Sequence, residues 1–301
     1  MTWKIAEKLI GKPSTDPDFK KQFDFVQFHP SYDYTDFVEG LRPEESGSAV
    51  IFKRRDGIFK AFCDKAAKDP DNKYVFVIDE INRGEISKIF GELFFSIDPG
   101  YRGEFNDNGN DNKVKTQYQN LINENEQIET GNVDEAEKGQ ETEKSIPYSF
   151  DKGFYVPNNV FVIGTMNDID RSVESMDFAF RRRFAFEEIT AAESESMVYN
   201  KLGKPGWTDD IIREATDRMR SLNFAIVNSQ IGGLTQQYQI GGSYFLKLEK
   251  LDFDFQRLWD VFLKGVIYEY YRGQPDAFEK LSQLEDAFNL VDGKGKKNAT
   301  K

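Results

Sequence analysis

Cysteine and histidine are nearly absent from this chain of 301 residues, which has only Cys63 and His29. So few thiols and imidazoles exclude both a disulfide framework and a Cys/His zinc site. Long apolar runs are also missing: no stretch of about 18 apolar residues occurs, and the amino end lacks the pattern of a signal peptide. The sequence therefore predicts a protein of the reducing cytoplasm without a membrane-spanning helix.

An excess of positive charge is lacking as well, because 52 acidic residues outnumber 40 Lys and Arg residues and the formal net charge is −12. This balance argues against a broad, non-specific grip on nucleic-acid phosphates, although a local basic patch remains possible. Any contact with DNA is expected to need another domain or a partner. Aromatic residues are abundant, with 27 Phe and 13 Tyr, and supply ample apolar area for one large or two modest cores.

Two short apolar runs end abruptly in polar residues, at positions 74–80 and 160–167. Runs that are apolar on both faces are typical of parallel strands covered by helices on both sides, and ligands bind at the carboxyl ends of such strands. We expect Asp79 to hold Mg²⁺ through its water shell and Glu80 to polarise a water that attacks a γ-phosphate. Asn167 can orient that same water. The pattern predicts a nucleoside triphosphatase.

Two longer strings carry a family resemblance: VFVIDEINRGEISKIFGEL at 75–93 and FYVPNNVFVIGTMNDIDRSVESMDFAFRRRF at 154–184. They resemble the McrB branch of the AAA+ superfamily, the motor subunits of McrBC-type modification-dependent restriction systems. The stretch 23–43 is similar to the segment that precedes the Walker B strand in that branch. The resemblance covers roughly residues 2–190 and thins beyond them.

The resemblance assigns further site residues. It implies that Asn82 and Arg83 face the nucleotide or the neighbouring subunit, although the pair could instead brace the following helix. Asp170 and Arg171 of the MNxxDR motif would contribute to hydrolysis and to its stimulation by a partner; they could also form an ion pair at a helix start. The resemblance also implies that one arginine of a run of three acts as an arginine finger, and the alternative is that the run is a solvated cationic helix end. The run consists of Arg181, Arg182 and Arg183.

A glycine-rich GxxxxGKS/T phosphate loop does not occur in the sequence. Aligned with the family, Thr2 matches the threonine that binds magnesium, and Met1 stands where the phosphate-binding lysine would be. We therefore expect a fragment that lacks the phosphate loop and the central strand leading into it. A sheet without that strand has unpaired edges, so poor stability and no hydrolysis are expected of the chain alone.

The expected fold class is α/β: the three-layer sandwich of AAA+ P-loop NTPases without its central strand, followed by a small α-helical lid. We expect an AAA+ core at 1–189, a lid at 190–290 and a flexible tail at 291–301. Residues 103–145, with eleven acidic residues and four lysines, are expected to be a disordered insert.

Local patterns predict the individual elements. Strands are predicted around 23–28, 74–78, 160–165 and 183–187. Helices are predicted at 57–68, 84–97 and about 172–181, with a turn and short helix at 31–41.

The functional hypothesis is a ring-forming motor, a hexamer by resemblance, that hydrolyses GTP or ATP with Mg²⁺. It would drive DNA translocation together with an McrC-like nuclease subunit, with DNA contacted through another domain. Two alternatives stay open: an ATP-driven protein-remodelling module of the MoxR or dynein type, and a non-hydrolysing interaction fragment.

Overall fold

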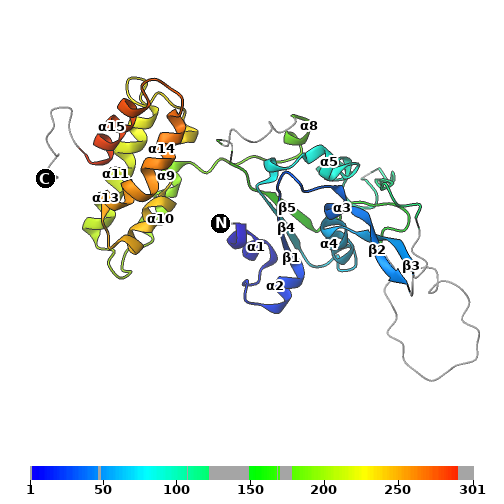
Figure 1. Cartoon of the computed structure of the whole chain (residues 1–301). Helices are drawn as coiled ribbons and strands as arrows, with labels where there is room; N and C mark the ends of the chain where they lie inside the picture. The colour runs from blue at the N-terminus through cyan, green and yellow to red at the C-terminus, as the bar shows by residue number, and fades with distance from the viewer. Residues whose placement is uncertain are drawn as a thin grey trace, which may run out of the picture. The chain divides into compact units, whose positions relative to one another are not determined.

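The computed structural model describes residues 2–46, 49–106, 108–121, 149–167, 169 and 178–290. The chain divides into two compact units, Met1–Ala185 and Phe186–Lys301 (Figure 1). The division falls close to the boundary at 189 that the sequence suggests. No described helix is long and apolar enough to cross a membrane.

The first unit is organised around a parallel sheet with the strand order β1-β4-β5. Its strands are β1 (Phe23–Gln27), β4 (Tyr74–Asp79) and β5 (Val160–Gly164). Five residues of β4, from its start to Ile78, are buried, and β1 and β5 flank the strand on both edges. The strands predicted around 23–28, 74–78 and 160–165 are therefore present.

Helices cover both faces of this sheet, and successive side chains of β4 point to opposite faces. Val75 and Val77 pack in one cluster with α1 (Thr2–Ile10) and α2 (Pro17–Gln22). The intervening residues of β4 belong to the larger core cluster on the other face. That cluster includes residues of α3 (Tyr34–Phe37), α4 (Ile58–Ala67) and α5 (Ile86–Phe90). The result is a sheet between two helical layers (Figure 1).

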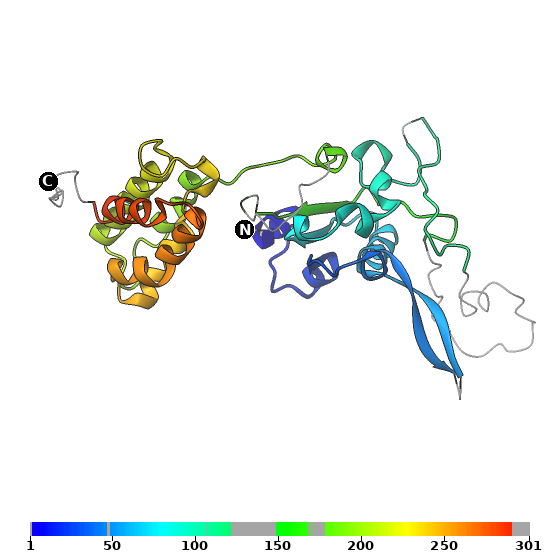
Figure 2. The same ribbon diagram turned by 45° about the horizontal axis from the view of Figure 1, so that its top comes forward.

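An antiparallel hairpin that the sequence patterns do not predict extends from this unit (Figure 2). It consists of β2 (Glu39–Ser46) and β3 (Ala49–Asp56). Pro43 and Gly40 lie within β2 and are poor strand formers, which hides the strand from propensity arguments. Pairing with β3 over the whole length of β2 outweighs that local preference.

The helix predicted at 84–97 is broken, and this prediction is corrected. The segment contains two short helices, α5 and α6 (Leu93–Ser96), and follows the turn of η1 (Ile81–Arg83). Gly91 separates α5 from α6 with φ +50°, and a Cβ there would lie 2.8 Å from the Tyr34 ring. A left-handed residue cannot continue a right-handed helix, and a close approach of this kind requires glycine.

The strand predicted at 183–187 is also wrong. Arg183 and Phe184 lie in a turn and bend after α8 (Phe178–Arg181), and residues 185–190 have no regular structure. A strand needs a partner for its backbone groups, and none of the described strands pairs with this stretch. Most of the helix predicted at 172–181 falls outside the described residues.

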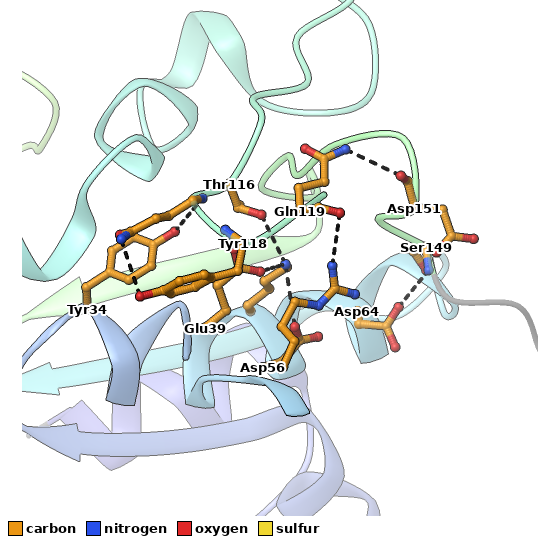
Figure 3. A network of polar contacts seen from close by, with 12 residues as sticks. Tyr34, Glu39, Asp56, Asp64, Thr116, Tyr118, Gln119, Ser149 and Asp151 are labelled. Atoms are coloured by element: carbon orange, nitrogen blue, oxygen red, sulfur yellow. Dashed lines mark hydrogen bonds and ion pairs between the residues drawn. The ribbon is translucent and has the colours of Figure 1, made fainter. Parts of the chain in front are cut away.

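Part of the stretch expected as an insert packs on the base of the hairpin. Val114 pairs with Phe154 in an antiparallel bridge, and η2 (Pro99–Tyr101) precedes the stretch. Figure 3 shows Thr116, Tyr118 and Gln119 beside Glu39 and Asp56. Residues 122–148 lie outside the described part of the chain.

In the described part of the second unit every regular element is a helix, and the longest is α11 (Asp209–Val227). Thr208 caps α11 by accepting a hydrogen bond from the Ile211 N–H at 3.3 Å. Leu222, Trp259 and Leu284 lie in its core. The remaining elements are α9 (Ala191–Ser194), α10 (Ser196–Tyr199), η3 (Gln236–Tyr238), α12 (Gly242–Phe245), η4 (Leu246–Leu251), α13 (Phe255–Leu258), the π-helical η5 (Trp259–Leu263), α14 (Lys264–Tyr271) and α15 (Ala277–Phe288).

Candidate functional site

The carboxyl ends of β4 and β5 lie side by side, because the two strands are parallel and paired up to Ile78 and Gly164. The backbone continues this pairing beyond the strands. The Thr165 N–H donates to the Ile78 carbonyl at 2.9 Å, and the Ile81 N–H donates to the Thr165 carbonyl at 2.9 Å. The loops that follow the two strands are therefore joined where the sequence places its polar residues.

Asp79 receives a side-chain hydrogen bond from the neighbouring loop. The Thr165 hydroxyl donates to Asp79 Oδ1 at 2.5 Å, across 86 residues of sequence. This bond fixes the orientation of the carboxylate. Thr165 is a residue that sequence reasoning missed as functional, although its place directly after the apolar run of β5 could have suggested it.

Glu80 adopts a left-handed backbone conformation, with φ 52° and ψ 44°. This region is uncommon for residues other than glycine, and such strain concentrates at functional sites. The carboxylate accepts a hydrogen bond from Arg83 Nε at 3.0 Å. Its side chain is 26% exposed, so solvent can reach it.

Asn82 and Asn167 are brought into direct contact. Asn82 Nδ2 donates to the backbone carbonyl of Asn167 at 3.1 Å. The side-chain carbonyl of Asn167 accepts from the Ile169 N–H at 3.2 Å, which braces the loop after β5. The structure thus gathers five of the residues singled out in the sequence: Asp79, Glu80, Asn82, Arg83 and Asn167.

The three arginines at 181–183 lie in different environments. The guanidinium of Arg183 lies 4.2 Å from the centre of the Phe94 ring and 3.9 Å from Asp98, and the side chain is 10% exposed. Arg181 and Arg182 are exposed. Arg183 therefore packs within the first unit, whereas the other two reach its surface.

The other predicted site residues are less informative. Thr2 is partly buried in the first turn of α1, and among the described residues no hydrogen bond joins its side chain to Asp79. Asp170, Arg171 and Met1 lie outside the described residues.

The donor groups at this site suit Mg²⁺ better than a transition metal. The described residues contain no group of three or more His, Cys, Asp or Glu side chains that could hold a metal ion by themselves. Magnesium commonly uses one or two carboxylates, keeps several waters and takes its other ligands from substrate phosphates. A single oriented carboxylate, that of Asp79, meets this requirement.

Comparisons with known proteins agree with the geometry. Residues 14–184 match the family described as AAA domain (dynein-related subfamily). The chain is 34% identical over 250 residues to the "Type IV methyl-directed restriction enzyme EcoKMcrB subunit" of Escherichia coli (strain K12), with 80% of this chain and 43% of that protein covered. It is 25% identical over 269 residues to the "Type II restriction enzyme BsuMI component YdiS" of Bacillus subtilis (strain 168), with 81% and 69% covered.

The chain thus spans less than half the length of its Escherichia coli relative. The matched region includes both strand ends and the loops that carry the candidate site. On this evidence the chain belongs to the dynein-related subfamily of AAA domains, and it is an McrB-like member of the AAA+ NTPases.

Proposed function

We propose that this chain is the NTPase module of an McrB-like restriction motor, which hydrolyses GTP or ATP with Mg²⁺. The observation that carries the proposal is the pairing of Asp79 with Thr165 and of Asn82 with Asn167 across the ends of β4 and β5. These contacts bring the Asp79 carboxylate, the Glu80 carboxylate and the loop of Asn167 together at the carboxyl ends of the strands. NTP hydrolysis needs such groups in fixed positions more than it needs covalent chemistry.

Each residue has a separate task in this proposal. Asp79 holds the hydrated Mg²⁺, Glu80 polarises the attacking water and Asn167 orients it. The Arg83 guanidinium, 3.0 Å from Glu80, holds that carboxylate in place. Arg181 and Arg182 are both exposed and are our candidates for the arginine finger, whereas Arg183 is packed on Phe94. We take Arg182, which directly follows α8, as the first of the two to test.

Hydrolysis would also need a phosphate loop, which the sequence does not contain. Within the described residues β5 pairs only with β4, and Val162 and Ile163 remain partly exposed. We propose that a strand leading into a phosphate loop adds to this edge of β5 when upstream sequence is present. Its carboxyl end would then lie beside Asp79 and Asn167.

The restriction role is preferred over protein remodelling because both relatives are named as parts of restriction enzymes. By extension we propose a cytoplasmic ring, hexameric by resemblance, that acts with an McrC-like nuclease and reaches DNA through another domain.

Nucleotide turnover tests the proposal directly. GTP and ATP hydrolysis should be measured for the 301-residue chain and for a version extended with the upstream sequence of its gene. We expect turnover only in the extended version, with loss of turnover but retention of nucleotide binding in its Glu80→Gln variant. Turnover in the short chain would refute the need for a phosphate loop, and an extended chain with such a loop that hydrolyses neither nucleotide would refute the NTPase proposal.

A further inference from the structure

The turn after Glu80 is attached to the loop after β5 at two separate points. One is a backbone bond, in which the Ile81 N–H donates to the Thr165 carbonyl at 2.9 Å. The other comes from the next residue along the turn, since Asn82 Nδ2 donates to the Asn167 carbonyl at 3.1 Å. A single bond would let the loop pivot about Thr165, whereas two bonds separated along the loop fix its direction.

The position of Asn82 is unusual for a residue of a surface turn. It is 7% exposed, although the adjoining Arg83 is exposed. Its orientation follows from chemistry, because only the amide nitrogen can donate to the Asn167 carbonyl. Asn82 Oδ1 is consequently directed elsewhere, and within the described part of the chain it is buried without a hydrogen-bond partner.

An unpaired buried carbonyl is costly and rare in native structures. Asn82 thus carries an unpaired Oδ1 while its Nδ2 holds the Asn167 loop, and unpaired buried groups of this kind call for a functional explanation.

We propose that Asn82 is a positioning residue that fixes the Asn167 loop relative to Glu80. The inference rests on the proposed NTPase function and adds to it a residue that acts through Asn167. Catalytic geometry tolerates little error: a displacement of about 1 Å can cost roughly 100-fold in rate. Loss of this attachment should therefore lower the rate of the chemical step and leave nucleotide binding intact.

A matched control residue exists in the same unit. Asn112 is 2% exposed, and its Nδ2 also donates to a backbone carbonyl, that of Arg102, at 3.1 Å. Its backbone N–H donates to the Glu104 carbonyl at 3.0 Å, so its recorded hydrogen bonds lead away from both strand ends. Replacement of Asn112 removes an equivalent buried hydrogen bond away from the candidate site.

The first test is kinetic and uses the upstream-extended chain. Asn82→Ala removes the side-chain amide, whereas Asn82→Asp preserves the volume but replaces the donor by an oxygen that the Asn167 carbonyl repels. We expect both variants to lower kcat by about 10-fold to 100-fold, with KM changed less than about 3-fold. Asn112→Ala should lower the melting temperature about as much as Asn82→Ala and leave kcat within about 2-fold. A kcat within 2-fold of the wild type in both Asn82 variants would overturn the proposal.

The second test needs no nucleotide and uses the 301-residue chain. Hydrogen exchange of the peptide that spans 165–169 reports directly on the Asn167 loop. We expect Asn82→Ala to accelerate its exchange by about 10-fold, the effect of losing one buried hydrogen bond, and Asn112→Ala to leave it unchanged. Equal exchange in the two variants would overturn the proposed attachment, even if a variant were too unstable for kinetics. Failure of the wild-type extended chain to hydrolyse nucleotide would instead count against the proposed function.

Discussion

Lys60 on α4 and Glu39 at the start of β2 form an ion pair whose side chains are 2% and 0% exposed. Lys60 also lies 3.4 Å from Asp56 and 3.4 Å from the Thr116 hydroxyl. The other carboxylate oxygen of Glu39 accepts from the Tyr118 N–H at 2.7 Å. The pair thereby joins the hairpin, α4 and the loop around 116–118 (Figure 3).

Replacing Lys60 by Met should destabilise the first unit by about 3–5 kcal/mol, because a carboxylate would be left buried without its main partner. The measurement is hydrogen exchange of the β4 amides, which reports on this unit alone. Lys21→Met is the control: its partner is Asp18 at 2.8 Å, but Lys21 is 74% exposed, and the cost should be much smaller because solvent screens the pair. Equal costs in the two variants would contradict the assigned role of burial.

The Glu39–Lys60 ion pair also predicts that the stability of the first unit falls at low pH. Burial by itself would raise the pKa of Glu39, but the hydrogen bond and charge of Lys60 and the Tyr118 N–H outweigh it, so that the pKa is lowered from its ordinary value of 4.5. A lowered folded-state pKa gives stability that is present above 4.5 and lost as the pH falls through the folded value. Below pH 4.5 the wild type should lose more of its unfolding free energy than Glu39→Gln, as measured by β4 amide exchange. Parallel losses in the two proteins would contradict the prediction.

The Glu80→Gly variant should be more stable than the Glu80→Ala variant. Its φ of 52° costs roughly 1–2 kcal/mol for a residue with a Cβ and little for glycine. We expect Glu80→Gly to be about 1 kcal/mol more stable than Glu80→Ala, which lacks the same carboxylate. Thermal unfolding of the two variants measures the difference, and a more stable alanine variant would show that this conformation is not strained.

Removal of the Thr165 hydroxyl should weaken the metal site without changing the fold. Thr165→Val loses the hydrogen bond that orients Asp79, and outer-shell contacts of this kind are worth about 10-fold to 100-fold in metal affinity. In the extended chain, the Mg²⁺ concentration for half-maximal turnover should rise accordingly. Thr165→Ser keeps the hydroxyl and should behave like the wild type; a rise in both variants would point to packing instead.

The arginine run should separate into one structural and one functional residue. Arg183→Ala loses the contact with Phe94 and should cost about 1–2 kcal/mol of stability. Arg182→Ala should change stability by less than about 0.5 kcal/mol yet lower turnover of the assembled, extended protein by about 10³-fold. Thermal unfolding and turnover measured on both variants test this separation. The reverse pattern would make Arg183 the finger.

Sequence reasoning succeeded where the signal was local. The runs around Asp79 and Thr165 identified buried parallel strands and placed polar residues at their ends, and the McrB resemblance is confirmed by the comparisons. It failed where longer-range contacts decided the outcome. The β2–β3 pairing outweighs the low strand propensity around Pro43, and the close approach of Tyr34 to Gly91 interrupts a helix that its apolar stripe predicts.

By itself, the sequence determined the family and the candidate chemistry, because both depend on residue types at short spacings. Tertiary structure decided which of those residues touch. The Asp79–Thr165 and Asn82–Asn167 contacts join residues 86 and 85 positions apart. Hydrogen bonds act only over about 3 Å, so such pairs exist only once the register of β4 against β5 and the turn after Glu80 are set. The same reason explains why only the folded chain distinguishes Arg183, packed on Phe94, from exposed Arg182.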